Sequence, residues 1–106
     1  MREATFLILT ALADEARHGY GIIQEVARMS GGRVSLLPGT LYSALDRLAA
    51  QGLVEVDREE VIDGRLRRYY RLCANGRTEL ASQTARLREL ASAAESRLRN
   101  LRANLA

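Results

Sequence analysis

The sequence contains no lysine and no tryptophan, and it has a single cysteine, a single proline and a single histidine. The lone cysteine, Cys73, cannot form an internal disulfide, which favours a reducing cytoplasm as the location of the protein. With His18 as the only histidine, the chain offers no cluster of cysteine and histidine ligands for a transition metal. We therefore expect no metal site and no cofactor.

Long hydrophobic runs are also missing. No apolar stretch approaches the roughly 18 residues that a membrane-spanning helix needs. The longest candidate, MREATFLILTALADEA at residues 1 to 16, is interrupted by charge on both sides of its apolar centre. A secretory leader can look similar, but the acidic pair Asp14 and Glu15 stands where its cleavage site should be. We expect a buried helix here and no membrane partner.

The sequence contains few residues that could act together as catalytic groups. General acid-base or nucleophilic catalysis needs convergent groups, such as a histidine beside a carboxylate or a thiol. His18 stands at the predicted start of a helix, where we expect a surface or capping residue. The sequence therefore predicts a protein that is not an enzyme.

Arginine, in contrast, is abundant. It supplies every basic side chain, and the chain of 106 residues carries a net charge of +3 and a pI near 9.6. The planar guanidinium matches phosphate oxygens and guanine edges, so a polyanionic partner is one interpretation. A solvated, mildly basic surface is the other. The length allows one domain, and 47% hydrophobic with 27% charged residues indicates a folded chain.

Three helices are expected in the first half of the chain. Apolar residues cover most of the circumference of residues 2 to 13, which indicates a helix buried on several sides. A second helix spans about 20 to 29 and ends at SGG. A third runs from Pro38, which suits the first turn of a helix, to about Gln51, with Gly52 as its stop.

The pattern changes after residue 52. β-Branched and aromatic residues flank the pair Asp63-Gly64, which is a strong signal for a β-hairpin. We expect strands over about 53 to 60 and 66 to 72. A two-residue loop and a longer loop both fit the sequence.

The remainder, from residue 74, predicts one long helix. Apolar and small residues recur at alternating spacings of four and three, which is the seam of a coiled coil. A helix lying on its own domain is the alternative, but that domain is too small to cover a helix of ~45 Å. We therefore favour a partner helix, with the seam formed by Leu80, Thr84, Leu87, Ala91, Ala94, Leu98, Leu101 and Leu105.

The third helix carries a polar side opposite its apolar stripe. At about 100° per residue, Leu41, Leu45 and Leu48 form the stripe. Small and hydrogen-bonding residues on the other side allow close approach to a second surface, as in a recognition helix that enters the major groove. A solvated helix surface is the alternative. The residues concerned are Ser43, Asp46, Arg47 and Ala50, flanked by Thr40 and Tyr42.

The hairpin favours the DNA interpretation. Arg65, Arg67 and Arg68 follow Gly64, at the place where a wing would meet phosphates or the minor groove. Charge at a hairpin tip also serves to protect an exposed edge. Three helices followed by a two-stranded hairpin is the order of a winged helix-turn-helix, so we expect a mainly α fold with a small β-hairpin (α+β).

Four segments resemble the PadR family of transcriptional regulators in order and spacing: HGYGI, PGTLYSALDRLAAQGLVE, DGRLRRYYRL and the glycine three residues before EL. The resemblance covers residues 4 to about 80. It implies a winged helix-turn-helix DNA-binding domain at 1–73 and a C-terminal dimerisation helix at 74–106. The DNA-binding residues it implies are Tyr20, Pro38, Gly39, Thr40, Tyr42, Ser43, Arg47, Gly64, Arg65, Arg67 and Arg68. Those for dimerisation are Phe6, Leu80, Leu87, Leu90, Ala94, Leu98, Leu101 and Leu105.

The resemblance implies a homodimeric regulator, a repressor by our hypothesis, that binds double-stranded DNA at an inverted-repeat operator. Members of this family often respond to small aromatic or drug-like molecules, so a small-molecule effector is one interpretation, although this sequence has no tryptophan and its aromatic residues are Phe6 and four tyrosines. Phe6 has two interpretations, as one wall of an effector pocket between dimer helices or, as we favour, as a residue packed in the core. The alternative function is a winged-helix module that binds protein and dimerises through a coiled-coil-like helix.

Overall fold

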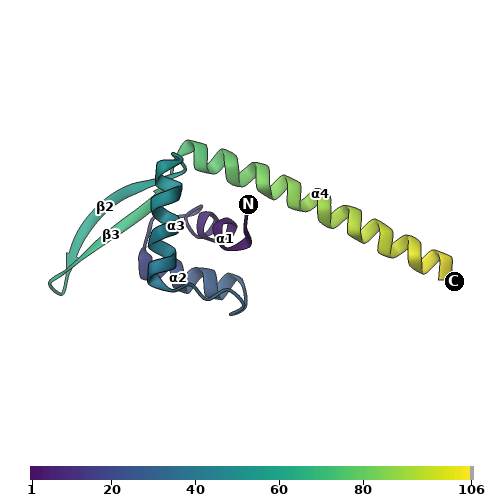
Figure 1. The fold of residues 1–106 in the computed structure, drawn as a ribbon, viewed down its shortest axis with the longest axis horizontal. Helices are drawn as coiled ribbons and strands as arrows, with labels where there is room; N and C mark the ends of the chain where they lie inside the picture. The colour runs from purple at the N-terminus through teal and green to yellow at the C-terminus, as the bar shows by residue number, and fades with distance from the viewer. Residues whose placement is uncertain (106) are drawn as a thin grey trace.

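A computed structural model describes residues 1 to 105. It contains helices α1 (Glu3–Ala11), α2 (Gly19–Met29), α3 (Pro38–Ala50) and α4 (Ala74–Leu105), and strands β1 (Arg17–His18), β2 (Val54–Ile62) and β3 (Arg65–Leu72). The first three helices form a compact group from which the β2–β3 hairpin and α4 project in opposite directions (Figure 1). The molecule is therefore elongated, with extents of 66 × 27 × 21 Å. The predicted α+β winged helix-turn-helix with a long C-terminal helix is confirmed.

One core joins the three helices to the base of the hairpin. Ile22 and Val26 of α2 and the predicted stripe of α3 are fully buried. Tyr70 and Leu72 of β3 and Val54 of β2 complete this core. Because these side chains recur at helical spacing on the helices and at alternate positions on β3, each element presents one apolar side to the same centre. The buried stripe of α3 consists of Leu41, Ala44, Leu45 and Leu48.

The sheet has a third strand that the sequence did not predict. Its order is β1-β3-β2, and Arg17 and His18 of β1 pair with Tyr70 and Tyr69 of β3. Two residues are too few to show a periodicity in the sequence, so β1 can be recognised only from its pairing with β3 in the structure. The Arg17 Nε donates a hydrogen bond to the Ala11 carbonyl at 2.7 Å. That bond ties the end of α1 to the edge of the sheet.

The hairpin turns through two residues, which decides between the two predicted loop lengths. Ile62 pairs with Arg65, and Asp63 and Gly64 both have positive φ, at 52° and 75°. Two consecutive left-handed residues make a type I′ turn, whose twist matches that of the strands. The strands run up to this turn, so β2 is longer than expected. Asp57 forms a β-bulge between Val56 and Arg58.

Tyr69 holds the centre of the hairpin against β1. Its ring lies 4.0 Å from the Arg58 guanidinium carbon and 5.4 Å, edge-on, from the His18 ring. As predicted, His18 stands at the start of α2, where it is the N-cap residue, but its side chain makes no capping hydrogen bond. It is half-buried rather than on the surface. Burial lowers the pKa of His18, and the nearby positive charge of Arg67 lowers this pKa further.

The end of α3, the start of β2 and the start of α4 meet at Leu53. The Leu53 N–H donates to the Leu48 carbonyl and the Gly52 N–H to the Ala49 carbonyl, while Gly52 has a φ of 75°. These two bonds form a Schellman motif, so Gly52 ends α3 as predicted. The Leu53 carbonyl then accepts the Cys73 N–H at 2.9 Å. We call this junction the Leu53 corner.

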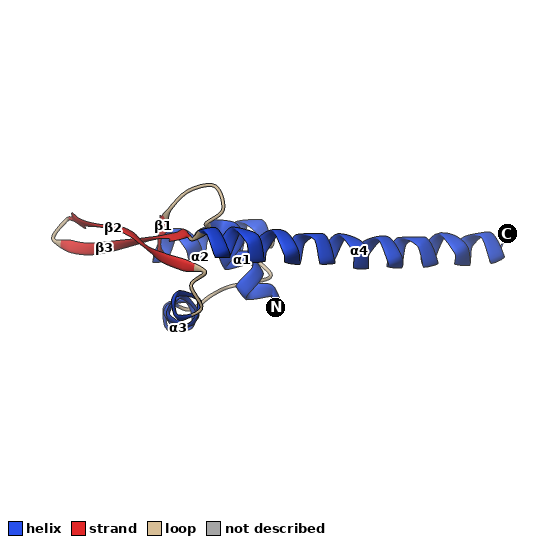
Figure 2. Ribbon diagram, turned by 90° about the horizontal axis from the view of Figure 1, so that it is seen from above, coloured by secondary structure: helices blue, strands red, loops and turns tan. Residues whose placement is uncertain are grey.

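Among the described residues, helix α4 is buried or packed against the core only near the Leu53 corner. Gly76 is its buried residue, and Leu80 still packs against the core. Figure 2 shows the rest of the helix extending away from the other elements. Five leucines on this part are exposed: Leu87, Leu90, Leu98, Leu101 and Leu105.

Replacing Gly76 by alanine should destabilise the protein, because the new Cβ would overlap the Leu53 carbonyl oxygen and lie 3.1 Å from Leu72 Cδ2. We expect a loss of about 1 to 3 kcal/mol in the free energy of unfolding, as for other overpacked sites. Denaturation by urea at matched protein concentration measures the loss. Gly39→Ala is the control, because nothing lies within 4 Å of its Cβ position; equal stability of the two variants would show that α4 does not depend on this contact.

The wild-type protein should lose stability as the pH falls below about 6.5, the ordinary pKa of histidine. The pKa of His18 is lowered in the folded chain, so the unfolded chain takes up its proton first and is favoured by acid. Melting temperatures between pH 8 and pH 5.5 measure this loss. His18→Gln should show a smaller decline over the same interval, and an identical decline would assign the effect to other groups.

Candidate nucleic-acid interface

The side of α3 that faces away from the core is built from small and polar residues. Ser43, Asp46 and Ala50 are exposed, as the sequence predicted. Gly39 is also exposed, and nothing lies within 4 Å of its Cβ position. These small residues leave room for a second surface along the middle of this side of α3. Such a surface can approach the backbone of α3 closely.

Tyr42 leans from α3 towards the start of α2. A Cβ on Gly19 would overlap the Tyr42 hydroxyl and lie 2.8 Å from its Cζ. The ring therefore needs glycine at position 19, a requirement that the motif HGYGI did not reveal by itself. Tyr42 remains 46% exposed, and Tyr20 beside it is 64% exposed. Two phenol groups thus lie near the point where α2 begins.

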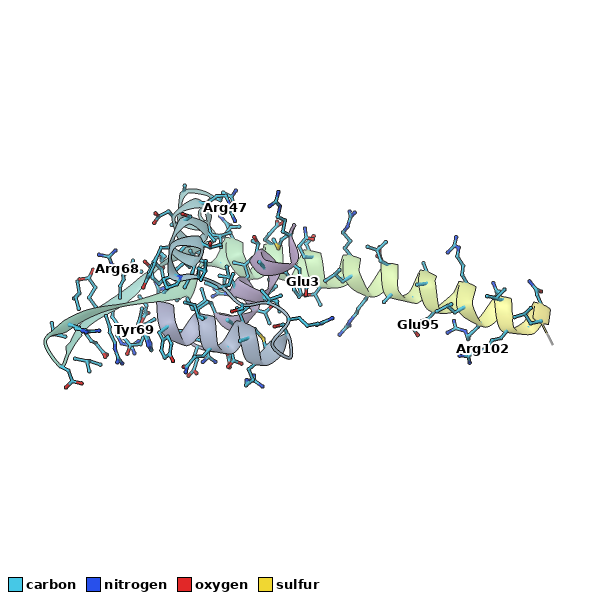
Figure 3. The ribbon with its side chains drawn as sticks, turned by 60° about the horizontal axis from the view of Figure 1, so that its bottom comes forward. Glu3, Arg47, Arg68, Tyr69, Glu95 and Arg102 are labelled. Carbon is cyan, nitrogen blue, oxygen red and sulfur yellow. The ribbon has the colours of Figure 1, made fainter. Side chains whose placement is uncertain are left out.

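Arg47 leans to the other side of α3, towards α1. Its Nη2 donates a hydrogen bond to the Thr5 hydroxyl at 3.3 Å, and Figure 3 shows it near the upper end of α3. Thr40, Ser43 and Arg47 line a groove of about 1340 Å³ between α1, α3 and α4. The sequence predicted an outward arginine and did not anticipate its contact with α1. Arg47 is exposed, with further N–H groups available to a partner.

The two helices that approach each other here both begin without a side-chain cap. The residues before their first turns are His18 for α2 and Leu37 for α3. In α3 the Leu41 N–H is bonded to the Leu37 carbonyl, so the N–H groups of Gly39 and Thr40 precede the first intrahelical bond. Pro38 occupies the first position and has no N–H. Both helix starts can therefore accept an anion.

Most arginines of the hairpin are paired with its own carboxylates. Arg68 binds Glu59 at 3.1 Å, Arg58 binds Glu60 at 2.8 Å, and Arg71 binds Glu55. Between residues 54 and 72 five arginines stand against five acidic residues. Within residues 1 to 105, the ion pairs of the structure include neither Arg65 nor Arg67. The hairpin arginines without an ion pair in the described chain therefore stand beside its turn, next to Asp63, which is in no ion pair of the described chain either.

The net charge of the chain comes from its last helix. Residues 1 to 73 contain ten arginines and ten acidic residues, whereas residues 74 to 106 contain six arginines and three glutamates. The value of +3 therefore says little about the side of the molecule that carries α3 and the hairpin. An electrostatic argument for this side must rest on individual arginines and helix termini rather than on the total charge.

Phe6 contributes to a second site, between α1 and α4. It is half-buried and lies outside the buried core of the described chain, so the preferred prediction of core packing is wrong. Phe6 lines a cavity of about 390 Å³ with Leu7, Gln83 and Leu87. Because Phe6 lies on the part of α1 that faces α4, it continues the row of exposed leucines. Ala94, between those leucines, is exposed as well.

Other kinds of site find no support in the described part of the chain. Residues 1 to 105 contain no group of three or more His, Cys, Asp or Glu that could hold a metal ion. None of the helices described combines the length and the apolar character needed to cross a bilayer.

Comparison with known proteins gives a consistent result. A transcriptional regulator of Mycobacterium tuberculosis, Rv3488, is 48% identical over 84 residues, covering 79% of this chain and 75% of its own. A PadR family transcription regulator from Clostridium difficile R20291 has a TM-score of 0.71 at 25% identity, covering 92% of this chain and 99% of its own. The structure of Bacillus subtilis PadR in complex with operator DNA shares the fold, with a TM-score of 0.69 at 23% identity over 78% of this chain and 47% of its own.

The model of the PadR-like family of transcriptional regulators matches residues 8–82. This span contains α2, α3 and the whole hairpin, and it reaches into α4. The matched residues include those that resembled the family in the sequence, from HGYGI to the glycine before EL. The chain belongs to the PadR-like family of transcriptional regulators.

Proposed function

We propose that the protein is a sequence-specific DNA-binding regulator that occupies an inverted-repeat operator as a homodimer and represses transcription. The observation that carries the proposal is the small, polar side of α3 beside two uncapped helix starts. Such a helix can enter a major groove while the helix starts bind the flanking phosphates. The likeness in fold to Bacillus subtilis PadR, whose structure contains operator DNA, supports the proposal.

We assign phosphate binding to three parts of the chain: the start of α2, the start of α3 and the hairpin turn. Tyr20 and Tyr42 offer hydroxyls beside the start of α2, and Gly39 and Thr40 offer backbone N–H groups at the start of α3. Pro38 sets the direction of that first turn. Contacts of this kind position the protein on the duplex without reading its sequence.

We assign base readout mainly to Ser43 and give Arg47 a smaller share of it. Ser43 lies near the middle of the exposed side of α3, where a hydroxyl can donate to or accept from a base edge. Arg47 is held towards α1 by Thr5, so it reaches the edge of the groove rather than its floor. We therefore assign Arg47 to the backbone or to an outer base pair.

Alanine substitution of Arg65 or Arg67 should weaken binding to specific and random duplexes by similar factors. Each substitution should also lower the slope of log K against log salt by up to about one, because one phosphate contact is lost. Arg68→Ala should change the slope less, since Arg68 is already paired with Glu59. Fluorescence anisotropy at several salt concentrations measures both quantities.

The control for these variants is Arg99→Ala, which removes the same charge from α4, away from the proposed interface. Its binding should match that of the wild type. Loss of specific binding alone in the Arg65 and Arg67 variants would mean that the hairpin reads bases, contrary to the proposal.

Dimerisation is proposed to use residues 74 to 106, with α1 at one end. From Leu87 onwards the leucines of α4 are exposed, and Leu87 and Leu98 are 48% and 61% exposed. Exposed leucines repeating at coiled-coil spacing are stabilised when a second helix covers them. The second helix would come from another copy of the chain, which also places Phe6 at the interface.

Replacing Leu87 and Leu98 together by aspartate should give monomers, because two unpaired charges would enter the seam. Sedimentation velocity measures the change. Ala93→Asp with Asn100→Asp is the matched control: it adds the same charge on the opposite side of α4 and should leave a dimer. A dimer that persists in the Leu87 and Leu98 variant would place the interface elsewhere.

A two-fold dimer presents two copies of α3, so the operator should be an inverted repeat with half-site centres about one helical turn, ~34 Å, apart. Selection from a random pool of duplexes identifies it, and transcription in vitro from a promoter that contains the selected site gives the sign of regulation. A protein-binding module is the alternative function. It would show no preference for any duplex in mobility-shift assays with competitor DNA.

A small-molecule effector is proposed to bind beside Phe6. The cavity there is lined by α1 and α4, the two helices assigned to the dimer interface. A ligand in this place would change the angle between subunits and hence the distance between the two copies of α3. That distance is the quantity to which an inverted repeat is sensitive.

A further inference from the structure

Arg47 is held by a neutral side chain that comes from another helix. Its Nη2 donates a hydrogen bond at 3.3 Å to the hydroxyl of Thr5, which lies 42 residues earlier, on α1. Arg58 and Arg68 of the hairpin are instead paired with glutamates, which neutralise them. Within residues 1 to 105, the ion pairs do not include Arg47. The bond to Thr5 therefore gives the guanidinium a direction and leaves its positive charge available to an anion.

The hydroxyl of Thr5 is used differently from those of other helical threonines. Thr10, Thr78 and Thr84 each donate to the carbonyl four residues earlier in the helix, which is a common bond for this residue type. In the described part of the chain, Thr5 makes no such bond and accepts from Arg47. Its oxygen therefore supports a side chain of α3 rather than the backbone of α1.

Thr5 is a firm support for a long side chain. It is half-buried, whereas Arg47 is exposed, and a β-branched side chain has few rotamers in a helix. The next turn of α1 contains Ile8 and Leu9, which are fully buried. The position of the Thr5 oxygen is therefore set by the packing of α1 into the core. An arginine without such a support would sample many rotamers.

The same bond places the guanidinium close to the residue assigned to base readout. Ser43 lies about one helical turn before Arg47 on α3. Both residues line the groove between α1, α3 and α4, together with Thr5. A duplex that meets Ser43 would therefore find Arg47 already oriented at its edge. An arginine that is ordered before binding loses less conformational entropy in the complex.

We propose that Thr5 is a positioning residue for DNA binding, which fixes the guanidinium of Arg47 beside α3 before the duplex arrives. This inference rests on the proposed DNA-binding function. Arg47 makes the contact with DNA, and Thr5 acts only through Arg47. The Thr5 oxygen accepts one of the five N–H groups of the guanidinium, so the others remain for a phosphate or a base edge. Immobilising this side chain only on binding should weaken the complex about threefold to tenfold.

Variants of Thr5 test the proposal with the full-length protein. Thr5→Val keeps the shape of the side chain and removes its hydroxyl, so it should raise Kd for the duplex selected from a random pool about threefold to tenfold. The salt slope should not change, because the charge of Arg47 remains. Thr5→Ser restores the acceptor and should bind within about twofold of the wild type. In an Arg47→Ala background, Thr5→Val should have no further effect. Fluorescence anisotropy measures all four.

Thr10→Val is the matched control, because Thr10 lies on the same helix but its hydroxyl bonds the Phe6 carbonyl. This variant should bind like the wild type. Urea denaturation of both valine variants checks that α1 stays folded.

A measurement without DNA tests the position of the side chain directly. NMR relaxation of the arginine Nε–H groups should show Arg47 to be more ordered than Arg65, which is in no ion pair of the described chain, and Thr5→Val should abolish this difference. Equal order of the two arginines in the wild type would overturn the inference. So would a Thr5→Ser variant that binds as weakly as Thr5→Val, or a Thr5→Val effect that persists without Arg47. These outcomes leave the proposed function intact as long as the wild type prefers its selected duplex. Absence of any preferred duplex would overturn the proposed function, and with it the role of Thr5, whatever the order of Arg47.

Discussion

The backbone contact at the Leu53 corner is the constraint on which the arrangement of the molecule depends. The Schellman motif at Gly52 turns the chain out of α3, the Leu53 carbonyl accepts the Cys73 N–H, and the glycine at position 76 lets α4 pass directly over that carbonyl. The helix proposed to read DNA, the hairpin and the helix proposed to dimerise thus diverge from one point. Few side chains are involved, so their relative directions are set by backbone geometry.

Around this corner, α3 is held from both flanks. On one side the ring of Tyr42 lies on Gly19 of α2, and on the other Arg47 reaches Thr5 of α1. Its outer side therefore has a defined direction even though its residues are small. Because positive and negative residues balance over residues 1 to 73, a complex formed by this part of the chain would rely on the positions of a few donors. Specificity of that kind depends on rigid placement more than on attraction at long range.

Long periodic features could be predicted from the sequence, and isolated contacts could not. The stripe of α3, its stop at Gly52 and the exposed leucines of α4 each follow from several residues at regular spacing. The strand β1 has two residues and is defined by its partner, so no local pattern reveals it. Likewise the pairing of Arg68 with Glu59 depends on the register of the hairpin, which the sequence left open until the turn was known to contain Asp63 and Gly64 alone. Phe6 was predicted to be a core residue because it stands in a helix rich in apolar residues, and no local pattern reveals that its side of α1 borders the cavity beside α4.

Because α4 is long, a small rotation at its first residues gives a large displacement at its last residues. A helix of 32 residues is about 48 Å long, and among the described residues it packs against the core near its start, at Gly76 and Leu80. A rotation of about 5° at the Leu53 corner would carry its far end through about 4 Å, close to the rise of three helical residues. In an assembly joined through α4, a rotation too small to disturb the packing around Gly76 would therefore change the distance between the two copies of α3. That distance decides whether both copies can bind successive turns of a DNA double helix.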